Sequence, residues 1–394
     1  MTDKLKLVSG DGQSRLKWEY EKERTSYDDL VALGTADMDF RTPDGILNAL
    51  SGVLERGHLG YPKVRDEFYG AIENHLKKTA GWTIDGRSSI GQNVGIYVSV
   101  WNIIDAVTEP GDRITYFTPV HSCFRRMIAI NSRIPIECPL LNREGKYSID
   151  YGALEACLSS GTKVLWLCNP HNPIGWAWTK DELSGIAELC MKYNVLILSD
   201  DVYSDLVFPG TQYTPIASLS KEISYRTMTL YSTSKAFNTM GLKHSFAVIE
   251  NPDLFKKYNE SLSKLDLEYG LNVMGMEATR AAYTLCDDWL EVLHAEIERK
   301  FRLVSSYITQ NLPGCIVTSS NSTYFAWVDM RPLRINPKML AYMIDQEEHI
   351  VVTNGADLGK GGAGFVRLNL ATSDNNLEEA LGRLKHFWNK HYQH

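Results

Sequence analysis

The sequence lacks the long apolar run, the secretion signal and the concentrated positive charge that mark membrane, secreted and nucleic-acid-binding proteins. Its longest apolar runs are short, such as residues 195–198, whereas a bilayer crossing needs about 20 residues. Residues 1–6 show no apolar stretch followed by small residues. Acidic and basic side chains are interspersed at a formal net charge of −7, which disfavours binding to nucleic acid. We therefore expect a cytoplasmic protein with neither a membrane nor a nucleic-acid partner.

Cysteine pairs with metal-ligand spacing are also missing. The seven cysteines are odd in number, widely spread and never arranged as Cys-x-x-Cys, which disfavours a disulfide framework and a zinc site. We expect no metal site, and we expect most of these side chains to be small, buried apolar groups. The cysteines are Cys123, Cys138, Cys157, Cys168, Cys190, Cys286 and Cys315.

What the sequence does contain is the composition of an ordinary globular protein. Of its 394 residues 44% are hydrophobic and 23% charged, and this length favours about two domains. Between about residues 90 and 250, short apolar runs alternate with helix-patterned stretches, which is typical of βαβ units and a mostly parallel sheet. We predict a helix that starts at the capping box of Thr179 and Glu182, and strands at residues 113–117, 163–167, 195–199, 227–231 and 245–249.

The last hundred residues have a different pattern. A long charged helix is predicted from about residue 288 to 310, and a final amphipathic helix follows residue 377. Between them we predict a helix near residues 337–347 and strands at 322–330, 349–353 and 364–370, which form a mixed α+β layer. We therefore expect an α/β protein with a large domain at residues 45–287 and a small domain made of residues 1–44 and 288–394.

A lysine at the end of a predicted strand is the first candidate catalytic group. Lys235 ends the segment Ser232-Thr233-Ser234-Lys235, a setting in which some enzymes hold a cofactor aldehyde, although a lone lysine can equally be a surface charge. The hydroxyls of Ser232 and Ser234 and the cation of Lys243 suit a phosphate. Gly95 precedes a predicted helix and could let backbone amides approach that phosphate, or it could be a simple loop glycine.

Four further polar residues stand where other predicted strands end or are interrupted. Asn172 lies in a stiff loop with two Asn-Pro dipeptides and could donate to an anionic ring oxygen, or the loop could be an ordinary turn. Asp200 follows an apolar run and could pair with a protonated pyridine nitrogen or cap a helix, and Tyr203 could hydrogen-bond a phenolic oxygen. Arg367 could bind a carboxylate or point to water from an edge strand.

Together these residue types describe pyridoxal phosphate acting on a small-molecule amino-acid substrate. Their order resembles that of the fold-type I pyridoxal phosphate enzymes, the aspartate aminotransferase superfamily, over nearly the whole chain. The resemblance implies a large cofactor-binding domain with a mostly parallel seven-stranded sheet and a smaller α+β domain.

A narrower resemblance is carried by several short motifs. The chain is similar to the MalY/PatB-type carbon-sulfur β-lyases, also known as cystathionine β-lyases of the aminotransferase fold. The motifs that carry this resemblance are Ala36-Asp37-Met38-Asp39-Phe40, Gly60-Tyr61-Pro62, Thr108-Glu109-Pro110-Gly111-Asp112, Leu167-Cys168-Asn169-Pro170-His171-Asn172-Pro173 and Gly364-Phe365-Val366-Arg367-Leu368-Asn369.

The resemblance implies a role for each candidate residue. Lys235 would form the Schiff base, Asp200 would pair with the ring nitrogen and Asn172 would contact the ring oxygen. Arg367 would bind the substrate carboxylate, with Asp37 and Asn172 also at the substrate. The remaining cofactor contacts would come from Gly95, the amides of Ile96 and Tyr97, His121, Tyr203, Ser232, Ser234, Lys243 and, from the neighbouring subunit of a homodimer, Tyr61.

Three positions depart from the pattern of the lyases. His121 stands where a tyrosine usually stacks on the ring and could titrate near neutral pH, while Tyr203 replaces a histidine and Trp176 a small or basic residue. We therefore predict a lyase that cleaves cystathionine or another cysteine S-conjugate. A class I/II aminotransferase and a regulatory protein that keeps the cofactor as a ligand remain alternatives. Trp176, Trp18, Tyr324 and residues 359–364 are possible walls of the substrate pocket.

Overall fold

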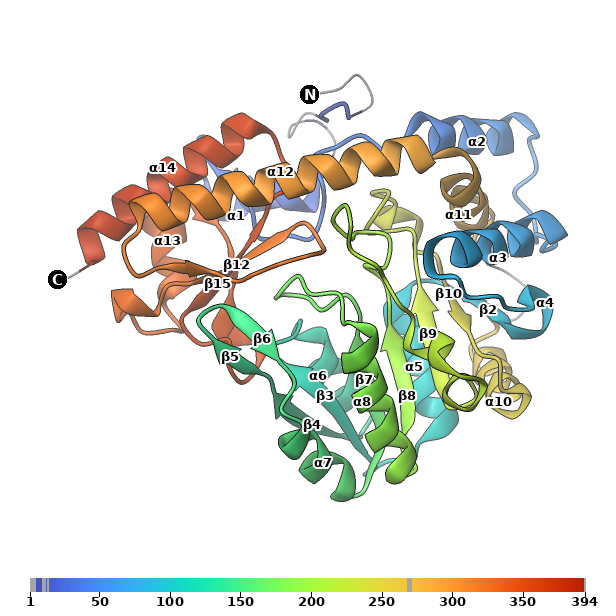
Figure 1. Cartoon of the computed structure of the whole chain (residues 1–394). Coiled ribbons are helices and arrows are strands. Elements are labelled where there is room, and N and C mark those ends of the chain that lie inside the picture. The colour runs from blue at the N-terminus through green and yellow to red at the C-terminus, as the bar shows by residue number, and fades with distance from the viewer. Residues whose placement is uncertain (1–4, 9–11, 13, 268–270, 393–394) are drawn as a thin grey trace.

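The protein is built around a seven-stranded sheet with the strand order β2-β10-β9-β8-β7-β3-β4 (Figure 1). The computed structural model describes residues 5–8, 12, 14–267 and 271–392, so residues 1–4, on which the expected absence of a secretion signal partly rests, lie outside it. The strands are β2 (Ile90–Asn93), β3 (Arg113–Thr118), β4 (Ile134–Pro139), β7 (Thr162–Cys168), β8 (Leu196–Asp200), β9 (Thr227–Tyr231) and β10 (Ser245–Val248).

The predicted mostly parallel sheet is confirmed. Pairings among β9, β8, β7, β3 and β4 are all parallel, whereas β10 is antiparallel to both β9 and β2. Strands β8 and β9 are buried almost throughout, as expected for strands that are covered on both faces.

Helices cover both faces of this sheet. One buried cluster joins the sheet to α5 (Ile96–Val107), α6 (Cys123–Ile130) and α10 (Pro252–Ser263). Another joins it to α7 (Tyr151–Ser159) and α8 (Lys180–Lys192), and the predicted capping box at the start of α8 is present. Near β2 and β10 lie α2 (Asp44–Glu55), α3 (Asp66–Ala80), α4 (Gly86–Ser89) and α11 (Val273–Leu285) (Figure 1). A short hairpin of β5 (Leu141–Arg143) and β6 (Lys146–Ser148) follows β4.

The C-terminal part has a core of its own around a four-stranded antiparallel sheet. Its order is β11 (Ile316–Val317), β12 (Phe325–Asp329), β15 (Phe365–Asn369) and β14 (Thr353–Asn354). The helices α13 (Leu340–Glu348) and α14 (Asp374–His391) and the C-terminal half of α12 (Asp287–Asn311) pack on it. The single strand that we predict at 349–353 is wrong: β13 (Ile350–Val351) pairs with β1 (Val31–Ala32), and only β14 joins β15.

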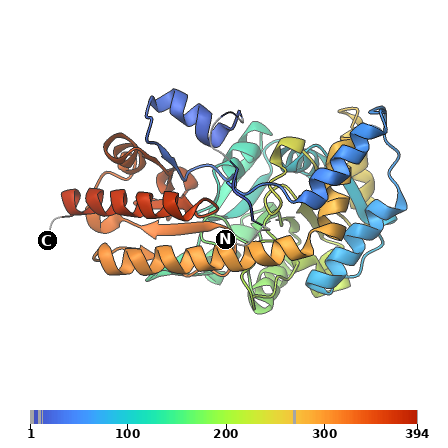
Figure 2. The same ribbon diagram turned by 90° about the horizontal axis from the view of Figure 1, so that it is seen from above.

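The N-terminal segment and α12 connect the two sheets. The short helical turns η1 (Leu16–Tyr20) and α1 (Glu21–Thr25) lead into β1, which lies beside the C-terminal part. Helix α12 runs alongside α14 and continues toward α11, as Figures 1 and 2 show from two directions. No helix within the described residues is both long enough and apolar enough to cross a membrane.

Candidate active site

The amine of Lys235 lies just beyond the end of β9. Its Nζ donates a hydrogen bond to the carbonyl of Ala36 at 3.2 Å and contacts the sulfur of Met240 at 3.3 Å. Burial, and then the positive charge of Arg367, lower the pKa of Lys235 to about 8. An amine with this pKa can lose its proton near neutral pH, which a surface lysine does not do.

Asn238, three residues after Lys235, connects the turn that carries this lysine to the N-terminal segment. Its Nδ2 donates to the carbonyls of Met38 and Phe40 at 3.1 and 3.0 Å, and its Oδ1 accepts from the amide of Met38 at 3.3 Å. Asn238 adopts a left-handed backbone conformation, with φ of 57°, which asparagine tolerates better than most residues. The sequence reasoning missed this residue, because nothing in its local pattern shows contacts with residues 200 positions away.

Asp200 is the last residue of β8 and its side chain is buried. Burial raises its pKa to about 7, and its Oδ1 has no hydrogen-bond partner in the described part of the chain. The alternative of a helix N-cap is wrong, because turns rather than a helix follow this strand. A buried carboxyl oxygen without a partner is costly, so this position suits a bound cationic or N–H group.

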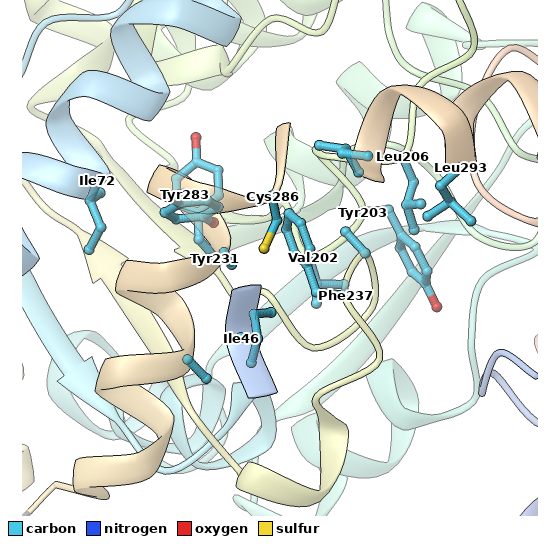
Figure 3. Packing of buried hydrophobic residues seen from close by; sticks show 14 of the residues in the cluster. Ile46, Ile72, Val202, Tyr203, Leu206, Tyr231, Phe237, Tyr283, Cys286 and Leu293 are labelled. Atoms are coloured by element: carbon cyan, nitrogen blue, oxygen red, sulfur yellow. The ribbon is translucent and has the colours of Figure 1, made fainter. Parts of the chain in front are cut away.

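Arg367 and Asn172 meet between the two sheets. The Nη1 of Arg367 donates to the Oδ1 of Asn172 at 2.9 Å, and Asn172 Nδ2 donates to the hydroxyl of Tyr203 at 3.4 Å. Figure 3 shows that the Tyr203 hydroxyl points out of the apolar cluster in which its ring is packed. Arg367 and Asn172 therefore form one contact although they stand 195 residues apart.

Arg367 is buried in an interior strand, so the alternative of an edge-strand arginine that points to water is wrong. Its Nη2 donates to the Gly34 carbonyl at 2.8 Å and to Thr353 Oγ1 at 3.0 Å, while its guanidinium lies 4.1 Å from the Phe325 ring centroid. Its Nε is buried without a partner, and no carboxylate among the described residues forms an ion pair with it. A buried guanidinium without a counter-ion suits an anionic ligand.

His121 follows β3 and does not titrate near neutral pH. Burial, and then the positive charges of Arg367 and Lys235, lower its pKa to about 3. Its Nδ1 accepts from the amide of Cys123 at 3.3 Å. The possibility that this histidine titrates near neutral pH is therefore not borne out, because burial keeps the ring neutral at physiological pH.

The predicted phosphate contacts gather at the start of α5. Gly95 has φ of +104°, a conformation that favours glycine, and a side-chain carbon added there would meet only Lys243 Cα, at 4.0 Å. The Ser232 hydroxyl donates to the His244 carbonyl at 2.6 Å and accepts from the Ser234 amide at 3.2 Å. The open N-terminus of this 12-residue helix, with Ile96 as its first residue, can receive an anion.

Two predicted tyrosines are exposed in this chain. Tyr61 is 87% exposed, whereas Tyr97 is the second residue of α5, its ring lies 5.6 Å from the Arg126 guanidinium, and it is within electrostatic reach of Asp200. The indole N–H of Trp176 donates to Glu182, which caps α8, and that of Trp18 donates to Asp39. Their role as pocket walls stays a prediction. By contrast, Tyr324 lies at the site, because its hydroxyl donates to the Ala36 carbonyl at 3.2 Å.

Comparison with known proteins gives the class of this protein. A family model described as "Aminotransferase class I and II" matches residues 29–384, so the chain belongs to that family. Its fold is the fold-type I architecture, as the sequence resemblance implies.

Within this family, carbon-sulfur lyases are among the similar proteins. The chain is 33% identical to "Cystathionine beta-lyase PatB" of Bacillus subtilis (strain 168), over 95% of this chain and 96% of that protein. It is 30% identical to "Protein MalY" of Escherichia coli (strain K12), over 98% of each. Cystalysin from Treponema denticola, whose crystal structure contains pyridoxal 5'-phosphate, superposes with a TM-score of 0.94 at 29% identity, over 99% of each chain.

The residues of this chain fit pyridoxal phosphate. The unpartnered Asp200 oxygen suits the nitrogen of its ring, the amine of Lys235 suits its aldehyde, and the helix start at Gly95 suits its phosphate. The unpartnered Nε of Arg367 suits a further anionic group.

Proposed function

We propose that this protein is a pyridoxal phosphate-dependent carbon-sulfur β-lyase that cleaves cystathionine or another cysteine S-conjugate to a thiol, pyruvate and ammonia. The observation that carries the proposal is a buried amine of lowered pKa within electrostatic reach of two groups: the Asp200 carboxyl, whose Oδ1 has no partner among the described residues, and the Arg367 guanidinium, whose Nε has none. The full-length similarity to a protein named as a cystathionine β-lyase supports the choice of reaction.

The cofactor supplies an aldehyde that binds amines and a ring that accepts electrons from the substrate's Cα. We propose that Lys235 holds the aldehyde, that Asp200 holds the ring nitrogen, and that Asn172 and Tyr203 bind the ring oxygen. His121 would lie against the ring as a neutral group. The phosphate would be held by Gly95, the amides of Ile96 and Tyr97, Ser232, Ser234 and Lys243.

The side chains of the protein itself bind the substrate and move its proton. Arg367, with Asn172 beside it, binds the α-carboxylate and thereby sets the direction of the Cα–H bond. The neutral amine of Lys235 accepts the Cα proton as a general base, and its pKa of about 8 suits this role near neutral pH. Loss of the thiol from Cβ, followed by hydrolysis, gives pyruvate and ammonia.

The assembly is part of the same proposal. The exposed Tyr61 supports a homodimer in which this tyrosine reaches the phosphate of the neighbouring subunit. The separate apolar core of the C-terminal part supports a large domain at residues 45–287 and a small domain from residues 1–44 and 288–394. The cytoplasmic location stays a prediction.

The test is pyruvate formation from cystathionine by the purified holoprotein without any 2-oxo acid. We expect pyruvate from the wild-type protein and none above background from Lys235→Ala. Undiminished pyruvate formation by the variant would contradict the role of Lys235. If the wild-type protein gives no pyruvate but exchanges amino groups between an amino acid and a 2-oxo acid, it is an aminotransferase, the alternative supported by the family model. The absence of any spectral change with amino acids would favour a regulatory protein.

A further inference from the structure

An ion pair lies one residue beyond the carbonyl that contacts Lys235, and the proposed chemistry does not use it. Arg15 precedes η1, and its Nη2 donates to Asp37 Oδ2 at 3.3 Å, to the Met38 carbonyl at 3.0 Å and to Asp39 Oδ1 at 2.7 Å. Its Nη1 is buried and has no partner among the described residues. Arg15 therefore has a donor to spare beside Asp37.

The two carboxylates that contact Arg15, those of Asp37 and Asp39, differ in how many hydrogen bonds they already accept. Asp39 is buried and also accepts from Lys17 Nζ at 3.0 Å and from the Trp18 indole at 2.8 Å, so it anchors the segment. The Asp37 side chain is 22% exposed and accepts only the long hydrogen bond from Arg15 within the described part of the chain. Asp37 thus keeps acceptor capacity for a ligand, whereas Asp39 does not.

Residues 34–37 form a bent segment that contacts three charged groups of the site. The Gly34 carbonyl contacts Arg367, the Ala36 carbonyl contacts Lys235 and the Asp37 side chain contacts Arg15. A substrate with its α-carboxylate at Arg367 and its Cα proton at Lys235 leaves Asp37 for a group on its side chain. Nearby, the negative charge of Asp37 raises the pKa of Lys235, which places the two groups within electrostatic reach.

We propose that Arg15 and Asp37 bind the far end of a cysteine S-conjugate that carries a second amino-acid group, as cystathionine does. Arg15 Nη1 donates to the distal carboxylate, and Asp37 accepts from the distal ammonium. This inference rests on the proposed lyase function and deepens it: the preferred substrates are zwitterionic at the far end, because an apolar end would leave the Arg15 donor buried and unpaired.

The experiment compares cystathionine with S-methyl-L-cysteine, which lacks a distal charged group. Pyruvate formation gives kcat/KM for each substrate, and the measured quantity is their ratio. For Arg15→Gln we expect kcat/KM for cystathionine, divided by kcat/KM for S-methyl-L-cysteine, to fall tenfold or more, because one charge-assisted hydrogen bond is lost. The fall should come from a higher KM for cystathionine. Asp37→Asn should lower the ratio as well, and Arg15→Lys should recover part of it.

Arg24→Gln is the matched control. Arg24 also belongs to the N-terminal segment and pairs with carboxylates, Glu21 at 2.6 Å and Asp345 at 2.9 Å, but it contacts no residue of the site. We expect its ratio to equal that of the wild-type protein. Thermal unfolding of each holoprotein shows whether the variant is folded.

The outcomes separate the two proposals. If Arg15→Gln and Asp37→Asn lower turnover of both substrates equally, or change neither, the pair only holds the N-terminal segment and the distal site is overturned. If the wild-type protein forms pyruvate from neither substrate, the lyase function itself is overturned.

Discussion

Two buried aspartates, Asp39 and Asp200, differ in their partners: the carboxylate of Asp39 is fully paired and stabilises the fold, whereas that of Asp200 has an oxygen left for a ligand. Asp39 accepts from Arg15, Lys17 and Trp18, and although burial opposes it, the nearby Lys17 lowers its pKa. Asp200 has an unpartnered oxygen, and burial raises its pKa to about 7. The difference teaches that burial of a charge alone says little about function, whereas burial without partners indicates a place for a ligand.

Asp200→Asn gives the largest expected effect on function. The amide keeps the shape but cannot carry the charge that a protonated ring nitrogen needs, so we expect kcat for pyruvate formation to fall about 10³-fold. Steady-state kinetics with saturating cofactor measure this. A fall of less than tenfold would mean that Asp200 does not act on the cofactor and that the contrast with Asp39 has another cause.

Asp39→Asn is expected to act on stability instead. It leaves the buried ammonium of Lys17 without its carboxylate, which costs about 3 kcal/mol of unfolding free energy. Urea unfolding of the apoprotein measures the change. The matched substitution Asp37→Asn removes only a long, partly exposed contact and should cost less than about 1 kcal/mol. An equal loss of unfolding free energy in Asp39→Asn and Asp37→Asn would contradict the distinction between Asp39, which anchors the segment, and Asp37, which is left for a ligand.

The two aspartates should give the apoprotein opposite dependences on pH. The folded pKa of Asp200 is raised, so its contribution to stability is full below about pH 4 and is lost as pH rises through about 7. Asp39 has a lowered pKa, so its contribution is present above about pH 4 and is lost as pH falls further. As the pH rises from 5 to 8, we expect the unfolding free energy of Asp200→Asn to increase by about 2 kcal/mol relative to that of the wild-type apoprotein. If the difference in unfolding free energy between the two proteins is the same at both pH values, the raised pKa of Asp200 is contradicted.

Asn238→Ala is expected to have a small effect and tests the link between the turn of Lys235 and the segment of Asp39. The substitution removes three hydrogen bonds to the segment that leads to Asp39, at a cost of about 1 kcal/mol of stability. It should also raise KM for the substrate more than it lowers kcat, because the segment that carries the Ala36 carbonyl, the hydrogen-bond acceptor of Lys235, loses its hydrogen bonds to Asn238. Kinetics that do not differ from wild type would show that the other contacts of the segment, such as those from Asn369, hold it without Asn238.

Much of the large sheet could be predicted from local pattern. The five predicted strands coincide with β3, β7, β8, β9 and β10 to within two residues, because apolar runs bounded by turns give strands directly. The antiparallel direction of β10 could not be predicted, because the alternation of side chains is the same for either direction. The strand at 349–353 splits because its two halves pair with different distant strands.

For the site, the sequence predicted residue types but not their contacts. Lys235, Asp200, Asn172 and Arg367 follow from polar side chains at the ends or within predicted strands. The contribution of Arg15 could not be predicted, because only the folded chain brings it to Asp37. The neutral state of His121 also depends on burial and on two cations that come from elsewhere in the chain.

Helix α12 gives the site a mechanical property. Near its start, the Trp289 ring stacks on Phe237, two residues from Lys235, with centroids 5.9 Å apart. Toward its other end, Val304 and Ile308 are packed in the core that carries the strand of Arg367. This continuous helix of 25 residues therefore joins the packing beside Lys235 to the core that carries Arg367. The spacing of the guanidinium and the amine is thus fixed twice, by this helix from outside and by the contacts of Arg367 with Asn172 and Gly34 from within.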